Sequence, residues 1–443
     1  MRDALSIFAA ARDAAARSGL TVAGRSYRFG ELAELTRERL RILEPAVAPG
    51  VPFVVIGSNT LATVITLYAL LELDIPALVL HPRLTDVERA AQARTPGPSD
   101  LPVHAAAIMH TSGTTGAPRA AVLTRSALLA SAAASAANLG WEDGDCWLLC
   151  MPLARIGGLS ILTRCLAARR CVALAEGFDP DRLPERIAAD GVTLASLVPT
   201  MLHRLLDRHP EWRAPPQLRA VLVGGAAAPD ALLQRAQQRG LPIILTYGLT
   251  ETCSQVAATP YAARHAPAAL GVGRALPGAR IRIRDGHVEV GGPMLMAGYL
   301  GEPALPPDAW FDTGDLGAID AQGCLRVHAR RTDLIVTGGE NVYPAEVERV
   351  LESCPGIVAA GVFGVPDPVW GQTVAAAVVG GEVPPEEAAL AAHLAVRLAP
   401  YKRPRQVCYV PELPLTSAGK PDRAALASFA ARLRPLGYPR GDG

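Results

Sequence analysis

Residues 109–119 (MHTSGTTGAPR) interleave hydroxyl side chains with glycines, directly after a predicted strand. Glycines let the backbone curl so that its N–H groups face inward, and the hydroxyls add further hydrogen-bond donors. This pattern favours a loop that cradles phosphate over a plain polar turn. It is not a Walker A loop, because Gly113 and Gly116 are too close together and no Gly-Lys pair follows them.

Two further segments place carboxylates where a nucleotide could bind. Residues 247–254 (YGLTETCS) end a predicted strand, and ligands of open α/β sheets bind beyond the carboxyl ends of the strands. The Thr250–Glu251 pair could hold a hydroxyl and a metal-bound phosphate there, although Glu251 alone could equally be a solvated loop residue. Residues 310–317 (WFDTGDLG) set two aspartates around a Thr-Gly turn, which suits a carboxylate that binds ribose hydroxyls. A turn without function is an equal alternative for that segment alone.

The last two segments lie toward the C-terminus. Residues 330–344 (RRTDLIVTGGENVYP) lead from a basic pair through an apolar strand and a Gly-Gly turn into a helix. Residues 413–423 (LPLTSAGKPDR) set Lys420 in a loop framed by glycine and proline. A lone lysine is usually a solvated charge, so Lys420 is a candidate site residue only in combination with the other four segments.

The elements that must position these segments follow from the hydrophobic pattern. We expect strands at 51–57 (buried), 75–80, 105–109, 146–151, 192–198, 220–223 and 243–246, and helices at 61–73, 125–137 and 230–238. Such strand–helix alternation predicts parallel sheets covered by helices. Residues 271–289 change to a period of two around RIRIR, which indicates a more antiparallel, half-exposed region.

The tail is predicted to form a separate unit. Its expected elements are helices at 345–351, 386–398 and 422–431, and strands at 358–362, 373–379 and 406–410. A boundary near 331–333 divides the chain into domains 1–331 and 332–443. Two or more domains also fit the length of 443 residues, which exceeds the size at which a single core usually stops growing.

Composition excludes several classes of protein. The chain is 50% hydrophobic and 19% charged, which fits a globular enzyme, and its formal charge of +1 lacks the basic excess of a nucleic-acid binder. Its eight cysteines form no C-x-x-C pair and are expected to be reduced core residues of a cytoplasmic protein. Neither a signal-peptide core nor a transmembrane stretch is expected.

In this order and spacing, the five segments resemble the adenylate-forming superfamily, which includes acyl- and aryl-CoA ligases, luciferases and peptide-synthetase adenylation domains. The resemblance extends from about Val54 onward. It implies an α/β fold: a large N-terminal domain with two helix-covered sheets and a small β-barrel, plus a small mobile α+β C-terminal lid domain. Within the superfamily, residues 247–255, 338–346 and the Trp370-Gly371 pair are most similar to the o-succinylbenzoate–CoA ligase family of menaquinone biosynthesis.

The resemblance also implies the ligands and the residues that bind them. ATP, Mg²⁺ and the cosubstrate coenzyme A would bind, with Tyr247 near the adenine and Asp315 and Arg330 at the ribose. Thr250 would contact the α-phosphate and Glu251 would hold the metal. The β,γ-phosphates would be wrapped by Thr111, Ser112, Gly113, Thr114, Thr115, Gly116 and Arg119.

Other implied roles concern the acid, the thiol and the lid. Lys420 would bridge the acid's carboxylate and the α-phosphate, and Thr332 would be the hinge. The pantetheine tunnel would be lined by Gly338, Gly339, Glu340 and Asn341. The acid pocket would include Arg155, Gly224 and Gly225.

This chain departs from the superfamily pattern at two places. Arg119 replaces the usual lysine after the phosphate loop, which keeps the charge but favours forked phosphate contacts. Ala154 and Arg155 stand where an aromatic residue and a histidine are usual, beside the acid pocket. Arg155 is therefore a candidate to hold the non-reacting carboxylate of a diacid, the alternative being a surface arginine lying along apolar neighbours.

The predicted activity is two-step. The acid's carboxylate attacks the α-phosphorus of ATP, pyrophosphate leaves, and the CoA thiol then attacks the acyl-adenylate. A ligase for another aryl or acyl acid, or an adenylation enzyme that loads a carrier protein, stays open, as does a homodimer. A Rossmann dehydrogenase is rejected because Gly271-Val-Gly273 precedes a Pro-Gly turn. A non-catalytic binding protein is disfavoured because Glu251, Asp315 and Lys420 are all present.

Overall fold

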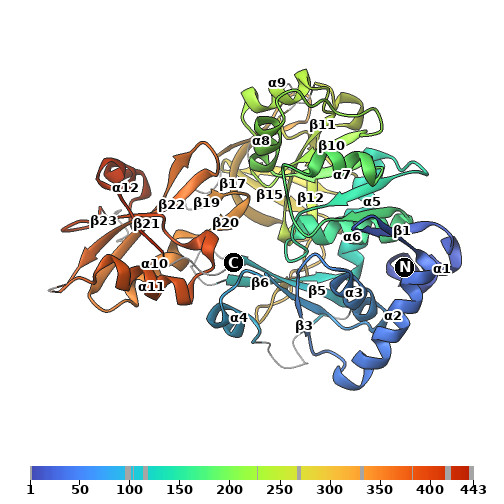
Figure 1. Cartoon of the computed structure of the whole chain (residues 1–443), viewed down its shortest axis with the longest axis horizontal. Helices are drawn as coiled ribbons and strands as arrows, with labels where there is room; N and C mark the ends of the chain where they lie inside the picture. The colour runs from blue at the N-terminus through green and yellow to red at the C-terminus, as the bar shows by residue number, and fades with distance from the viewer. Residues whose placement is uncertain are drawn as a thin grey trace. The chain divides into compact units, whose positions relative to one another are not determined.

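The computed structural model describes residues 2–94, 101–102, 104–112, 118–226, 228–266, 271–329, 334–381, 383–414 and 421–438. The chain divides into two compact units (Figure 1). Unit 1 comprises Met1–Pro82, Thr95–His110 and Ala120–Ala329. Unit 2 comprises Arg83–Arg94, Thr111–Arg119 and Arg330–Gly443. The boundary expected at 331–333 lies outside the described residues.

A nine-stranded sheet forms the centre of unit 1, in the order β13-β12-β11-β10-β9-β7-β8-β1-β2. Strands β8, β7, β9, β10 and β11 run parallel, as the strand–helix alternation predicted. Every residue of β7, β9 and β10 is buried, which is expected for parallel strands covered on both faces. The strands span β1 (Ser18–Val22), β2 (Arg25–Arg28), β7 (Cys146–Leu149), β8 (Cys171–Leu174), β9 (Leu194–Leu197), β10 (Ala220–Val223), β11 (Ile243–Leu249), β12 (Ser254–Ala258) and β13 (Arg274–Ala275).

Five helices lie in this part of the chain: the first follows a strand of a second sheet and the other four follow strands of the central sheet. They are α5 (Arg125–Leu139), α6 (Ile156–Ala168), α7 (Leu183–Ala189), α8 (Pro199–Arg208) and α9 (Asp230–Gln238). Helices α8 and α9 lie together beside β10 and β11 (Figure 1). The Gly271-Val-Gly273 segment leads into the short strand β13 and not into a helix. The rejection of a dinucleotide-binding fingerprint there agrees with this arrangement.

A second sheet of unit 1 has the order β16-β6-β5-β4-β3. Its strands are β3 (Phe53–Ile56), β4 (Ala77–Leu80), β5 (Ala105–Ser112), β6 (Pro118–Thr124) and β16 (Gly298–Tyr299). The helices that come before these strands in the chain or connect them are α1 (Ile7–Ala14), α2 (Phe29–Leu43), α3 (Leu61–Leu73) and α4 (Asp86–Gln92). The buried strand predicted at 51–57 was wrong in its burial. Val54 and Ile56 are each 37% exposed, because β3 lies at the edge of the sheet.

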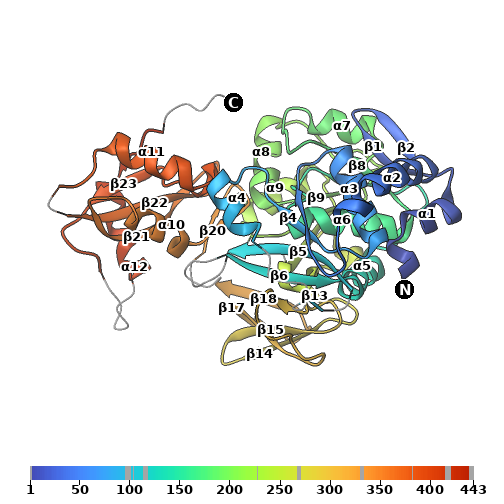
Figure 2. The ribbon, with the colours of Figure 1, turned by 90° about the horizontal axis from the view of Figure 1, so that it is seen from below.

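The period-two region contributes β14 and most of β15 to a four-stranded sheet of unit 1, in the order β14-β15-β17-β18 (Figure 2). Its strands are β14 (Arg280–Arg284), β15 (His287–Gly291), β17 (Phe311–Ile319) and β18 (Leu325–Ala329). All neighbouring pairs are antiparallel. Arg280 and Arg284 are exposed while Val288 and Val290 are buried, so the prediction of a half-exposed antiparallel region is confirmed.

Unit 2 contains a six-stranded sheet on which α10 (Pro344–Glu352) and α12 (Arg423–Leu426) pack, while α11 (Glu387–Arg397) packs on α10. The strands are β19 (Ile335–Thr337), β20 (Glu340–Val342), β21 (Ile357–Asp367), β22 (Gly371–Gly380), β23 (Gln406–Tyr409) and β24 (Arg434–Pro435). The helix predicted at 422–431 is present, but only Arg423–Leu426 is α-helical and Ala427–Arg432 continues as a 3₁₀ helix. Buried Leu426 and the partly buried Phe429 are three residues apart and pack in one apolar cluster, which suits 3₁₀ spacing.

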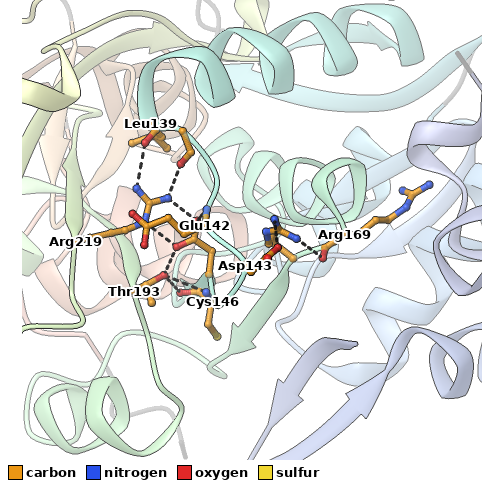
Figure 3. A network of polar contacts seen from close by, with 10 residues as sticks. Leu139, Glu142, Asp143, Cys146, Arg169, Thr193 and Arg219 are labelled. Carbon is orange, nitrogen blue, oxygen red and sulfur yellow. Dashed lines mark hydrogen bonds and ion pairs between the residues drawn. The ribbon is translucent and has the colours of Figure 1, made fainter. Parts of the chain in front are cut away.

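A buried ion pair fixes the amino ends of three strands of the central sheet (Figure 3). Arg219, just before β10, donates through Nε to Asp145 at 2.7 Å, and Asp145 also accepts from the Thr193 hydroxyl at 2.8 Å. Burial alone would raise the pKa of Asp145, but the hydrogen bonds from Arg219, the Glu142 backbone and Thr193 together hold that pKa below its ordinary value. Arg219 also donates to the Leu139 carbonyl at the end of α5.

All eight cysteines are free thiols, and all except Cys171 are buried, in agreement with the expectation of reduced core residues. In the part of the chain that the structure describes, no helix combines the length and apolar character needed to cross a bilayer.

Candidate active site

The carboxyl ends of the parallel strands bring three predicted segments to one edge of the central sheet. Because β7, β9, β10 and β11 run in one direction, the residues that follow them emerge on the same side. Arg155 follows β7, Gly224 and Gly225 follow β10, and Tyr247 and Glu251 lie at and just beyond the end of β11. This is the edge at which ligands of open α/β sheets bind.

Tyr247 and Asp315 are joined by a buried hydrogen bond. The Tyr247 hydroxyl donates to Asp315 Oδ2 at 2.7 Å, and each residue is 5% exposed. Asp315 lies within β17, where the predicted Thr-Gly turn is an irregular part of the strand: Gly314 has φ +73°, and the Asp315 amide donates to the Thr313 hydroxyl at 3.2 Å. The structure thereby brings together two of the residues expected to bind the nucleoside.

Glu251 lies in the short 3₁₀ turn Thr250–Thr252 and is held from two sides. Its Oε1 accepts a hydrogen bond from the Tyr299 hydroxyl at 2.7 Å, and its carbonyl accepts one from the Met296 amide at 2.7 Å. The turn ends at Cys253, which adopts the left-handed conformation with φ +51°. Tyr299 was missed in the sequence, where the only local signal is a Gly-Tyr pair.

The donor set at this turn fits Mg²⁺. A hard cation of this kind prefers oxygen ligands, and it is usually held by one or two carboxylates together with substrate phosphates. Glu251 supplies a carboxylate that is 9% exposed, and Thr250 supplies a neighbouring hydroxyl. Among the described residues, no group of three or more His, Cys, Asp or Glu side chains could hold a metal alone. The site therefore suits a metal ion that arrives with ATP.

Gly224 and Gly225 need the absence of a side chain for different reasons. A Cβ on Gly224 would lie 2.3 Å from the Thr246 hydroxyl oxygen, so the backbone passes directly beside β11. Gly225 has φ +80°, a conformation that side chains disfavour. Their place at the sheet edge agrees with their assignment to the acid pocket, which stays a prediction.

Arg155 is the N-cap residue, directly before α6. Its backbone is extended, with φ −116° and ψ 147°, and its side chain is half-buried. The helix start packs tightly on the segment before it, because a Cβ on Gly158 would lie 2.3 Å from the Pro152 carbonyl oxygen. The position of Arg155 is thus set by close backbone packing and not by a long flexible loop.

In unit 2, the Gly-Gly turn and the Trp370 segment lie against each other. Gly338 and Gly339 have φ of +59° and +84°, and the Gly338 amide donates to the Trp370 carbonyl at 2.9 Å. A Cβ on Gly338 would lie 2.6 Å from the indole ring, so only glycine fits. Glu340 is buried and Asn341 half-buried in β20. The segment assigned to coenzyme A and the Trp370-Gly371 pair, both of which carry the resemblance to the ligases, therefore form one feature.

Several predicted residues lie outside the described residues: Gly113, Thr114, Thr115, Gly116, Arg330, Thr332 and Lys420. Of the phosphate loop, the structure describes the flanks. Strand β5 ends at Ser112, and the Thr111 hydroxyl donates to the Arg119 carbonyl at 3.3 Å.

Comparison with protein families gives two matches. Residues 87–300 match the model of the AMP-binding enzyme, and residues 346–420 match that of the AMP-binding enzyme C-terminal domain. Among curated proteins, 2-succinylbenzoate–CoA ligase of Bacillus mycoides (strain KBAB4) is 40% identical over 329 residues, covering 71% of this chain and 68% of that protein. The 2-succinylbenzoate–CoA ligase of Bacillus licheniformis is 40% identical over 357 residues, or 76% of this chain and 74% of that protein.

Solved structures give the same picture. o-Succinylbenzoate CoA synthetase (MenE) of Bacillus subtilis, a double mutant with the product analogue OSB-NCoA, is similar with a TM-score of 0.88 and 30% identity, covering 97% of this chain and 99% of that one. The same enzyme with the acyl-adenylate OSB-AMP has a TM-score of 0.68 at 30% identity, covering 95% and 97%. The amide bond synthetase McbA of Marinactinospora thermotolerans has a TM-score of 0.82 at 28% identity, covering 93% and 97%.

Proposed function

Because this chain belongs to the AMP-binding enzyme family, we propose that it is an AMP-forming acid–CoA ligase whose acid is o-succinylbenzoate. The observation that carries the proposal is the buried arrangement at the end of β11. There, the carboxylates of Glu251 and Asp315 are each fixed by a tyrosine hydroxyl at the sheet edge where a nucleotide would bind. The relatives with this name are about 40% identical over most of the chain.

The first half-reaction joins the acid to AMP. The acid's carboxylate attacks the α-phosphorus of ATP and pyrophosphate leaves, so negative charge must be offset while the bonds change. Asp315 accepts hydrogen bonds from the ribose hydroxyls, and Thr250 donates to the α-phosphate. Glu251 holds Mg²⁺, which when bound neutralises charge on the phosphates.

The second half-reaction forms the thioester. The CoA thiol, as thiolate, attacks the carbonyl carbon of the acyl-adenylate, and AMP leaves. The pantetheine arm is assigned to the Gly338–Gly339 turn, whose backbone is fixed by close packing on Trp370, since a Cβ at Gly338 would meet the indole ring. Lys420 serves the first step, where it bridges the acid's carboxylate and the α-phosphate.

The choice of acid rests on the relatives and on Arg155. o-Succinylbenzoate has two carboxylates, of which one reacts, and the other needs a cationic or polar partner if it is buried. Arg155 is the N-cap residue of α6 at the sheet edge beside the proposed site, and a guanidinium can bind a carboxylate through two hydrogen bonds.

The proposal extends to domains and location. Residues 1–331 form the N-terminal domain and 332–443 a mobile C-terminal domain, supported by the assignment of most of each range to a different compact unit. A cytoplasmic location is supported by eight free cysteines, since disulfides are rare in that compartment.

The test is a panel of acids with Mg²⁺-ATP and CoA, analysed by mass spectrometry. With o-succinylbenzoate we expect AMP, pyrophosphate and the o-succinylbenzoyl thioester as products. Benzoate, which has one carboxylate, and succinate, which is aliphatic, are the acids for comparison. The appearance of ADP and phosphate would overturn the AMP-forming mechanism. A thioester from a different acid only would preserve the ligase and reject the substrate.

A further inference from the structure

Tyr299 lies far from Glu251 in sequence but is bound to it in space. The two residues are 48 positions apart, and the phenol donates to Glu251 Oε1 at 2.7 Å in a buried environment. Tyr299 is 9% exposed. A buried phenol needs a hydrogen-bond partner, and an ionised carboxylate is the stronger kind of acceptor.

The backbone around Tyr299 is fixed independently of that hydroxyl. Strand β16 pairs antiparallel with β6, in the register Gly298–Val122 and Tyr299–Ala121. The Ala297 amide donates to the Val122 carbonyl at 2.9 Å, and Gly298 has φ +146°, which a side chain would strain. Tyr299 is therefore presented by a rigid strand pair and not by a loose loop.

The same short segment also holds the backbone of Glu251. The Met296 amide donates to the Glu251 carbonyl at 2.7 Å, three residues before Tyr299. One segment thus fixes both the main chain and the side chain of the residue proposed to hold the metal. A tyrosine with only a packing role would need only the contact of its ring with Phe311. The two rings are tilted relative to each other, and their centroids lie 6.5 Å apart.

We propose that Tyr299 is a positioning residue that orients the Glu251 carboxylate for Mg²⁺, an inference that rests on the proposed function. The phenol occupies one carboxylate oxygen and so restricts the rotation of the side chain. A carboxylate has lone pairs on both oxygens, so the second oxygen keeps its capacity for a cation. Without the hydroxyl, Glu251 would lose this restraint and the metal-bound nucleotide would bind less tightly.

The experiment measures ATP affinity of the full chain by calorimetry, once with Mn²⁺ as the metal probe and once metal-free in EDTA. The dissociation constant of ATP without metal, divided by that with Mn²⁺, is the metal-dependent gain in ATP affinity. In Tyr299→Phe, which removes one oxygen and keeps the ring, we expect this gain to fall by about tenfold, the scale of a hydrogen bond to a charged group. Metal-free ATP affinity should stay within about twofold.

Two matched variants make the result specific. Tyr247→Phe removes the equivalent hydroxyl from Asp315 and should weaken ATP equally with and without Mn²⁺. Tyr438→Phe removes a hydroxyl that donates to the Pro404 carbonyl at 2.8 Å, and it should change neither value. An unchanged metal-dependent gain in Tyr299→Phe would overturn the proposal.

The outcome stays decisive if the Phe variant folds poorly. 3-Fluorotyrosine at position 299 keeps the ring and the hydroxyl but makes the O–H a stronger acid. A positioning role predicts a changed metal-dependent gain, whereas a packing role predicts none, which would also overturn the proposal. Failure of the wild-type protein to bind Mn²⁺-ATP or to form AMP would instead reject the proposed function itself.

Discussion

At the scale of single residues, Arg155 is the side chain on which the choice of acid most depends. It is the N-cap residue of α6 and is half-buried, and the superfamily pattern that the sequence resembles implies a histidine at this position. A guanidinium there can discriminate between acids only if one of them carries a second carboxylate. The surface-arginine alternative predicts no discrimination.

We predict that Arg155→Ala raises KM for o-succinylbenzoate far more than KM for a matched monoacid. The expected difference is about 1.5–3 kcal/mol, the scale of a hydrogen bond to a charged group. Steady-state kinetics with the two acids measure it. Arg213→Ala, an exposed arginine that donates to the Gln238 carbonyl, is the control and should change neither KM. Equal weakening of both acids would remove Arg155 from the argument for this substrate.

Sequence patterns predicted Tyr247, Glu251 and Asp315 as site residues but not Tyr299. The first three lie in dense local motifs, where residue type and spacing carry a signal. Tyr299 acts through a partner 48 positions away, and a Gly-Tyr pair does not reveal such a contact. The same reason explains the Asp145–Arg219 pair, whose members are 74 positions apart.

At the scale of elements, the sequence predicted most of the parallel strands, because their apolar runs are buried on both sides, and it predicted the helices α3, α5, α9, α10 and α11. It failed where the order of strands decides burial. Val54 and Ile56 look like core residues, yet β3 is an edge strand, and edge position depends on pairings that a local pattern does not contain. The early strand β1 pairs with β8 and was not expected for the same reason.

The start of α6 gives a prediction from two adjacent glycines. In Gly158→Ala, the new Cβ would meet the Pro152 carbonyl oxygen at 2.3 Å, so backbone must move and Arg155 with it. In Gly157→Ala, the Cβ would meet only the flexible end of the Met151 side chain at 2.9 Å. We expect Gly158→Ala to raise KM for the acid at least about tenfold, since small misplacements are costly. Gly157→Ala should stay near wild type, and equal effects would contradict this account.

The Asp145–Arg219 pair is expected to stabilise the central sheet. Asp145→Asn leaves a buried guanidinium without its counter-charge and should cost about 3 kcal/mol of unfolding free energy at pH 7. Asp143→Asn, on the same loop, removes only an exposed pairing with Arg17 and Arg170 and should cost less than about 1 kcal/mol. Thermal and urea unfolding of both variants measure the difference.

The pH dependence of that difference follows from the lowered pKa of Asp145. A carboxyl whose folded pKa lies below its unfolded value of about 3.9 contributes stability that is complete above that value. The contribution is lost as the pH falls below it toward the folded pKa. The difference in unfolding free energy between wild type and Asp145→Asn should therefore be constant from pH 7 to 5 and should decrease below about pH 4. A constant gap at all pH values would contradict the assigned ionisation.

At the scale of the whole molecule, the two half-reactions require one active site to support two nucleophilic attacks, first by the acid's carboxylate and then by the CoA thiol. The chain has two compact units, whose main parts meet in the sequence at Ala329 and Arg330, two residues before the predicted hinge Thr332. The residues assigned to ATP are divided between the units: Tyr247, Thr250, Glu251 and Asp315 belong to unit 1, while the phosphate-loop residues, Arg330 and Lys420 belong to unit 2. The turn assigned to CoA also belongs to unit 2. A mobile C-terminal domain would allow Lys420 to serve adenylation and the Gly338–Gly339 turn to serve thioester formation.

This proposal predicts that the two half-reactions can be separated by substitutions in the C-terminal domain and its hinge. Lys420→Ala should slow adenylation by roughly a hundredfold or more, the scale for one donor to a developing charge, and spare thioester formation from supplied acyl-adenylate. Thr332→Pro fixes φ and removes an N–H at the hinge, so it should spare one half-reaction and impair the other. Pyrophosphate exchange measures the first step, and thioester release from synthetic acyl-adenylate measures the second. Arg349→Ala, a substitution within α10 and away from the hinge, is the control. If Thr332→Pro leaves both rates unchanged, the hinge lies elsewhere, and if Lys420→Ala slows both steps equally, the two-conformation proposal fails.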